Sequence, residues 1–270
     1  MYPDVIVTMS TAESALVTVL HRTPALVEHL GLHGVRLDEA RGNAVMHTPN
    51  RPVQERACVL VAALRIAGFG VAAPACFTPS PEQTERARQA AMVHALNVSR
   101  AALNAWDKVS DNLCGEDGRP LDDDAYWPRR AELDRVVWEQ FASVFLVHGA
   151  VMLEQGRRAA AGMTGQDSRE AAHYLGVLAA ALEEGRQVRA DGERALAALL
   201  DTEGQTRDEA AYADAVAERD AEGWHAASTW INHGDLLAYL AYLGTRTATP
   251  APSPAMHLPR TPQPGAARTM

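Results

Sequence analysis

The chain has little of the chemistry by which enzymes are usually recognised. Its 270 residues include three cysteines, Cys58, Cys76 and Cys114, which are odd in number and widely spaced, and no CxxC pair indicates a zinc or redox site. No GxxxxGK followed by Ser or Thr, no GxGxxG after a strand, no GxSxG and no HExxH occurs. These absences remove the common signatures of nucleotide binding, serine hydrolysis and zinc proteolysis. We therefore expect a protein that is not an enzyme and that carries no cofactor.

Long hydrophobic runs are also lacking. The longest strongly apolar stretch, residues 141–153, has 13 residues, whereas a helix that crosses a membrane needs about 20. We interpret it as a buried core helix. The first twenty residues contain no basic segment ahead of a hydrophobic block, so a secretory signal is not expected. Together with the unpaired cysteines, this pattern predicts a cytoplasmic protein without a membrane span.

Positive charge is scarce in the middle of the chain. Residues 81–245 hold 28 acidic and 16 basic side chains, whereas residues 1–80 are balanced and the whole chain carries a net charge of −9. Lys108 is the single lysine, so the remaining basic residues are arginines. Because an acidic surface repels phosphates, binding to nucleic acid through counterion release is not expected.

The first part of the chain, residues 1–79, has the pattern of a small α/β domain. A capping box at Ser10 to Glu13 predicts a helix that restarts at Thr23 and Pro24. The other expected elements are strands at 5–9, 35–40, 43–48 and 70–77 and a helix at 52–68. The resulting order, β-α-β-β-α-β, is the split βαβ or ferredoxin-like pattern.

Prolines at positions 79 and 81 separate this domain from a predicted acidic four-helix bundle at residues 80–245, with Ser80 as the cap of its first helix. The four helices are expected at about 81–113, 128–160, 167–200 and 206–245, and their short links predict antiparallel neighbours. Residues 246–270 contain many prolines and almost nothing to bury, which predicts a disordered tail.

Histidines and carboxylates suggest a metal site in two places. His29, His33 and His47 form one possible ligand set, but Gly31 and Gly34 are expected to end a helix there, so that His29 and His33 do not share a face. The second place is the bundle, where helices in such folds carry Glu-x-x-His motifs. Two tetrads of that form exist, ending at His173 and His225.

The spacing of the tetrads argues against a paired metal centre. If the third and fourth helices reverse near residue 203, the two tetrads are offset by about 12 Å, whereas a dinuclear centre needs metals about 3.5–4 Å apart. The same geometry places His233 level with His173, and Glu154 of the second helix level with both. The candidate metal ligands are therefore His173, His233 and Glu154, which suit zinc, iron or manganese.

Three further polar residues are expected to have structural roles. His148 lies in the most apolar segment, where a histidine usually makes one hydrogen bond and stays neutral. Arg189 and Arg219 fall on seam positions of their helices and need acidic partners such as Glu183, Glu222 or Asp220.

The expected function is association with a protein partner or with a second copy of the chain. The apolar positions of the second helix exceed one stripe, which would leave area for a partner: Val136, Val137, Trp138, Phe141, Val144, Phe145, Val147, Val151 and Leu153. A metal-binding bundle is one alternative. Another is a DNA-binding regulator with a helix-turn-helix and wing at residues 11–48, although the segment PALVEHLGLHG has no arginine, lysine, asparagine or glutamine to contact base edges.

Overall fold

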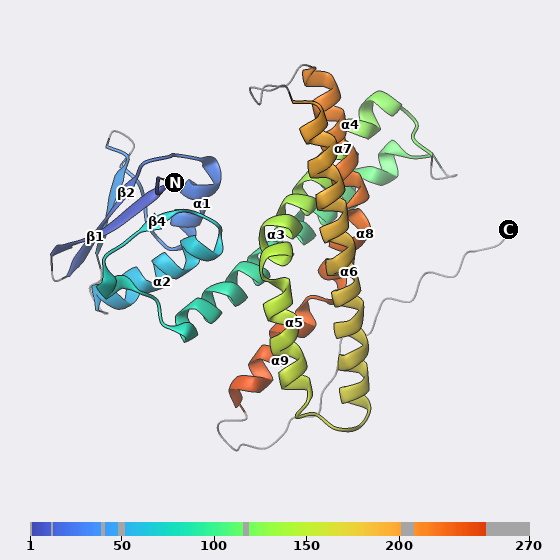
Figure 1. Ribbon diagram of the computed structural model, residues 1–270. Helices are drawn as coiled ribbons and strands as arrows, with labels where there is room; N and C mark the ends of the chain where they lie inside the picture. The colour runs from blue at the N-terminus through green and yellow to red at the C-terminus, as the bar shows by residue number, and fades with distance from the viewer. Residues whose placement is uncertain are drawn as a thin grey trace.

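The computed structural model describes residues 2–11, 13–38, 41–47, 52–115, 119–200 and 208–246. This part of the chain is mostly helical, at 73%, with a small mixed sheet of four strands at its N-terminus (Figure 1). The predicted Pro-rich tail lies outside the described residues from position 247 onward.

The sheet has four strands, with β1 and β2 at its centre. The N-terminal elements are β1 (Val5–Thr11), β2 (Ser14–Val19), α1 (Pro24–Leu32), β3 (Asn43–His47), α2 (Val53–Ile66), β4 (Val71–Ala72) and the short 3-10 helix η1 (Ala75–Phe77). The strand order is β3-β2-β1-β4, in which β1 runs antiparallel to β2 and parallel to β4. Alternate residues such as Val5, Val7 and Val17 are buried, so the sheet buries one face in the core that it shares with α1 and α2.

The predicted ferredoxin-like pattern is wrong, because the observed order is β-β-α-β-α-β. The capping-box signal at residues 10–13 belongs instead to a hairpin, where the side chains of Thr11 and Ser14 are hydrogen-bonded at 2.6 Å. The residues that follow, SALVTV, are half β-branched and pair as a strand with both neighbours. The helix begins only at Pro24, where the Thr23 side chain accepts a hydrogen bond from the Leu26 backbone.

Two further N-terminal predictions are corrected by the same elements. The strand expected at 35–40 is reduced, among its described residues, to a single bridge between Asp38 and Asn43. Within 11–48, the described residues contain one helix, α1. The helix-turn-helix required for the DNA-binding alternative is therefore not formed there.

Beyond Pro79, the residues that the structure describes form four helical segments. They comprise α3 (Pro81–Leu113), the continuous run of α4 (Asp123–Gln140), η2 (Phe141–Phe145) and α5 (Leu146–Ala160), then α6 (Gly165–Ala198), and finally α7 (Glu209–Glu222), α8 (Trp224–His233) and α9 (Asp235–Arg246). Ser80 caps α3 as predicted, in a reciprocal pair of hydrogen bonds with Gln83. Figure 1 shows α3 running obliquely past the other helices. A regular four-helix bundle is not confirmed.

The helices share one large core, and the expected reversal between the third and fourth segments is observed. Trp230 donates a hydrogen bond from Nε1 to the carbonyl oxygen of Leu178 at 3.1 Å, and the rings of Tyr174 and His233 stack at 4.8 Å. These pairs place the midpoint of the reversal close to residue 204, beside the predicted 203.

The helix from Asp123 to Ala160 is the one described helix that is long and apolar enough to cross a membrane by length and composition. Its most apolar window has a mean hydropathy of 1.5, and 50% of that window is buried inside the structure. A helix that packs at the centre of a folded domain can have the same length and apolar composition.

The N-terminal part and the helices meet along α2, α3 and α5. His148 is hydrogen-bonded through Nε2 to the carbonyl oxygen of Ile66 at 2.8 Å, which confirms a single structural hydrogen bond for this histidine. Separate clusters of buried side chains lie on the two sides of residue 79. The division into domains at that position stays a prediction.

Candidate functional site

An open groove with a volume of about 630 Å³ lies between α4, η2, α6 and α7, and the end of α2 closes one side of it. Trp138, Val147 and Val216 supply apolar walls, and three arginines line the rest together with three carboxylates. The residues Ala142 and Ser143 come from η2, which is a π-helical turn. Because π-helical turns inside α-helices are frequent at functional sites, this groove is the first candidate for one.

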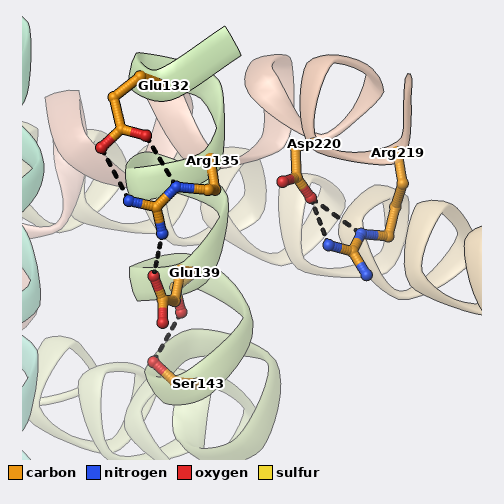
Figure 2. Close-up of polar contacts among 6 residues, drawn as sticks. All are labelled: Glu132, Arg135, Glu139, Ser143, Arg219 and Asp220. Carbon is orange, nitrogen blue, oxygen red and sulfur yellow. Dashed lines mark hydrogen bonds and ion pairs between the residues drawn. The ribbon is translucent and has the colours of Figure 1, made fainter. Parts of the chain in front are cut away.

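The charges that line the groove are already paired (Figure 2). Arg135 donates to both oxygens of Glu132, at 2.8 and 2.9 Å, and to Glu139 at 3.1 Å. The hydrogen bonds from Arg135 lower the pKa of Glu132 and, in turn, raise the pKa of the arginine. Arg219 donates to Asp220 at 2.9 Å, whereas Arg189 pairs with Glu193 at 2.7 Å. The sequence therefore predicted the need for acidic partners and, for Arg219, the partner itself.

This pairing limits what the groove can do. Its lining, among the described residues, contains no histidine, cysteine or lysine, and the Ser143 hydroxyl donates to the carbonyl oxygen of Glu139 at 2.7 Å. That hydroxyl is therefore engaged by a backbone carbonyl. An anionic ligand would have to displace a carboxylate from an arginine.

Two buried carboxylates, one on α4 and one on α7, are each paired with an arginine of the same helix. Asp134 and Asp220 are 4% and 3% exposed. Arg130 donates to Asp134 at 3.0 Å, and its guanidinium lies 4.4 Å from the ring centre of Trp224. Burial raises the pKa of Asp220, against the opposing effect of its hydrogen bond from Arg219.

The raised pKa of Asp220 predicts how stability depends on pH. Because the folded state holds this proton to a higher pH than the unfolded state, Asp220 favours folding most below its ordinary pKa of 3.8, and that contribution is lost as pH rises through the folded-state value. The variant Asp220→Asn has no carboxyl group there and should not lose stability in this way. The free energy of unfolding of the variant minus that of wild type should therefore increase with pH. Urea unfolding of both proteins between about pH 4 and about pH 7 measures the difference. A difference that stays constant, or that decreases with pH, contradicts this assignment.

A second feature lies at the turn between α3 and α4, and we name it the aromatic end surface: Trp106, Leu121, Tyr126 and Trp127. Leu121 is 69% exposed and Trp127 is 57% exposed. The ring of Tyr126 makes edge contacts with Trp106 at 5.3 Å and with Trp127 at 5.0 Å. Large apolar side chains that are this exposed and adjacent usually mark a contact surface.

Charged residues of both signs border the aromatic end surface. Asp122 caps α4 by accepting hydrogen bonds from the backbones of Asp124 and Ala125. Asp123 lies in the same turn, and Arg129 follows on the next turn with its side chain exposed. The surface therefore offers an apolar centre with an acidic and a basic margin.

The predicted metal ligands are brought together only in part. His173 and His233 both contact the ring of Tyr174, and burial together with the neighbouring His173 lowers the pKa of His233. Glu154 pairs instead with Arg158 on the exposed side of α5. Within the described ranges, no group of three or more His, Cys, Asp or Glu side chains is placed to hold a metal ion. Metal binding by these residues stays a prediction.

His33 and His225 have structural roles. α1 ends at Leu32 and His33 is its C-cap, as the glycines predicted. Burial and the neighbouring His29 lower the pKa of His33. His225 contacts Glu184 of α6 at 2.9 Å. The side chain of His47 lies outside what the structure describes.

The broad apolar face expected on the second helix is mostly internal. Val137, Trp138, Phe141, Val144, Phe145 and Leu153 are buried, and only Val147 and Val151 are more than 40% exposed. The exposed aromatic residues lie instead at the start of α4, within a segment that the sequence marked only as a charged helix start. No family model, no curated protein and no solved structure matches this chain significantly.

Proposed function

We propose that this protein is a non-enzymatic association protein that binds a second copy of itself through the aromatic end surface. The observation that carries the proposal is the exposure of Trp127, which contacts the ring of Tyr126, together with the exposure of Leu121 just before the start of the same helix. Tryptophan, tyrosine and arginine are the residues that contribute most to binding free energy at protein interfaces. Burying Trp127 and Leu121 against another protein would remove their apolar area from water.

Charge favours a second copy as the occupant of this surface. The acidic turn at Asp122 to Asp124 and the exposed Arg129 lie on the same end of α4. In a two-fold contact the same patch is used by both partners, so residues of one copy meet different residues of the other. The aspartates of one copy can then pair with Arg129 of its partner around the apolar centre. A strongly acidic or a strongly basic partner would complement only one margin.

The expected association is reversible. The aromatic end surface holds four side chains, two of them half-buried by their neighbours. Interfaces of small area are typical of transient complexes. The net charge of −9 also opposes the approach of two copies at long range. We therefore expect a monomer–dimer equilibrium that depends on concentration and shifts toward dimer as salt screens this repulsion.

Removal of one aromatic ring tests the proposal. The variant Trp127→Ala should weaken dimerisation by about 30-fold, which corresponds to about 2 kcal/mol for a central interface residue. Tyr2→Ala is the matched control, because Tyr2 is 86% exposed and lies on the N-terminal part of the chain. Sedimentation velocity over a series of concentrations measures the dissociation constant of each protein.

Two results would count against the proposal. The first is a wild-type protein that stays monomeric at every concentration, which excludes a second copy as the partner. The second is a dimer that Trp127→Ala and Tyr2→Ala leave equally strong, which places the interface elsewhere on the molecule.

A further inference from the structure

Two of the three cysteines, far apart in the sequence, lie side by side in the N-terminal part. Cys58 lies on α2 and is 6% exposed, whereas Cys76 lies in η1 and is exposed. The Cys58 thiol donates to the carbonyl oxygen of Cys76 at 3.7 Å and to that of Thr78 at the same distance. The buried sulfur therefore contacts the backbone of the very residue that carries the exposed thiol.

Neighbouring contacts fix the position of Cys76 against α2. Gln54, one helical turn before Cys58, donates from Nε2 to the same Cys76 carbonyl oxygen at 2.8 Å. Phe77, the next residue in η1, is fully buried in the N-terminal core. The backbone of Cys76 is thus held against α2, and its exposed side chain can change rotamer without disturbing the core.

From this juxtaposition we infer that Cys58 and Cys76 form a reversible intramolecular disulfide when the protein meets a peroxide. The exposed thiolate of Cys76 attacks the peroxide, whose O–O bond breaks as an S–O bond forms, and one water leaves. The Cys58 thiolate then attacks the resulting sulfenic sulfur, an S–S bond forms and a second water leaves. In sum, two thiols are oxidised and one hydrogen peroxide is reduced to two waters.

Cys58 has the properties of the second, resolving thiol rather than the first. Burial raises the pKa of the Cys58 thiol, and the neighbouring Cys76 adds to the effect. Cys58 is therefore mostly protonated near neutral pH and reacts slowly, whereas Cys76 is open to solvent. The formation of the disulfide after the first step should accordingly become faster as pH rises.

The disulfide would close the segment between the two cysteines, which contains β4 and the second half of α2. It would also tie η1 to α2 directly before Ser80, the cap of α3. Because a crosslink restricts the unfolded chain, the oxidised protein should melt at a higher temperature than the reduced protein. This site lies in the N-terminal core rather than at the aromatic end surface, so the inference does not depend on the proposed function.

Thiol counting on the full chain tests the inference. Wild-type protein is treated with hydrogen peroxide, unfolded and reacted with a thiol-specific dye, with and without later reduction. Free thiols should fall from three to one and return on reduction, and the oxidised monomer should lose the mass of two hydrogen atoms. Cys114→Ser is the matched control and should still lose two thiols, because Cys114 lies at the end of α3. Cys76→Ser should form no intramolecular disulfide.

Cys58→Ala provides a second variant with an apolar replacement at the buried position. In this protein the exposed Cys76 should be oxidised and remain as sulfenic acid, which a dimedone probe traps. The inference is overturned if wild-type protein keeps three thiols at peroxide levels that oxidise Cys76 in Cys58→Ala. It is equally overturned if the oxidised wild-type protein links Cys76 to Cys114 or only to a second chain.

Discussion

Replacing Trp230 with alanine is expected to lower the free energy of unfolding by about 3–5 kcal/mol, the range for removing a large aromatic side chain from a core. Trp230 is fully buried, and its ring lies 4.6 Å from that of Phe145 and 6.4 Å from that of Phe141. Its indole N–H donates to the carbonyl oxygen of Leu178, so that this one side chain connects α8 with α6 and η2. The substitution leaves a cavity and removes this hydrogen bond.

Urea unfolding followed by circular dichroism measures this loss. Trp127→Ala is the matched control, because it removes the same side chain from a position that is 57% exposed. Surface substitutions usually change stability by about 0.5 kcal/mol or less. If the two variants lose equal stability, Trp230 is not at the centre of the helical core.

The second large effect concerns two glycines of α6 that should respond to alanine with opposite signs. A Cβ atom at Gly185 would lie 2.7 Å from Cζ of Phe141, and closer still to another atom of that ring. Phe141 is 1% exposed and packs against Trp138 and Trp230, so the ring has no free space to enter. Gly185→Ala should therefore cost about 1–3 kcal/mol, as overpacking in a core does.

Gly176 lies on the same helix, and no described atom lies within 4 Å of the position that a Cβ atom would occupy there. Because glycine is less favourable than alanine inside a helix, Gly176→Ala should instead gain about 0.5–1 kcal/mol. Urea unfolding of the two variants beside wild type gives both values. Equal gains in stability for both would mean that α6 does not approach Phe141 closely.

The helices beyond residue 80 are predictable from the sequence where their ends carry local signals. Helix α3 is predicted at 81–113 and is observed at Pro81–Leu113, since Ser80 and two prolines fix its start. The fourth segment is predicted as one helix but is interrupted at Gly223 and Gly234. A Cβ atom at Gly223 would collide with Trp138. The apolar pattern along one helix does not predict such a close approach between two helices.

The N-terminal error has a physical cause. A capping box at residues 10–13 satisfies backbone groups only if a helix follows, but the next residues alternate in burial and include Val17, Thr18 and Val19. Pairing with two neighbouring strands, which lie on both sides of β2, outweighs the local helix signal. Sequence periodicity over six residues is too short to decide between these outcomes.

The contacts that matter for function depend on segments that are distant in sequence. The antiparallel register expected between the third and fourth helical segments correctly places His173 beside His233. This register can be predicted because it follows from the length of one connection. Glu154 is not brought to them, because it lies on the exposed side of α5, where it pairs with Arg158 one turn later. The proximity of Cys58 to Cys76 and the edge contact of Tyr126 with Trp106 likewise arise from tertiary packing, so spacing alone could not reveal them.

Photo-crosslinking at Ala131 tests most directly whether two copies meet at the start of α4. Ala131 is exposed and lies one turn after Trp127, so a benzophenone amino acid there leaves the aromatic end surface intact. Mixed chains labelled with light and heavy nitrogen distinguish crosslinks between copies from those within one. We predict crosslinks from position 131 of one copy to residues between Trp106 and Ala131 of the other. Crosslinks confined to single chains, or reaching a different face of the second copy, would contradict the proposed interface.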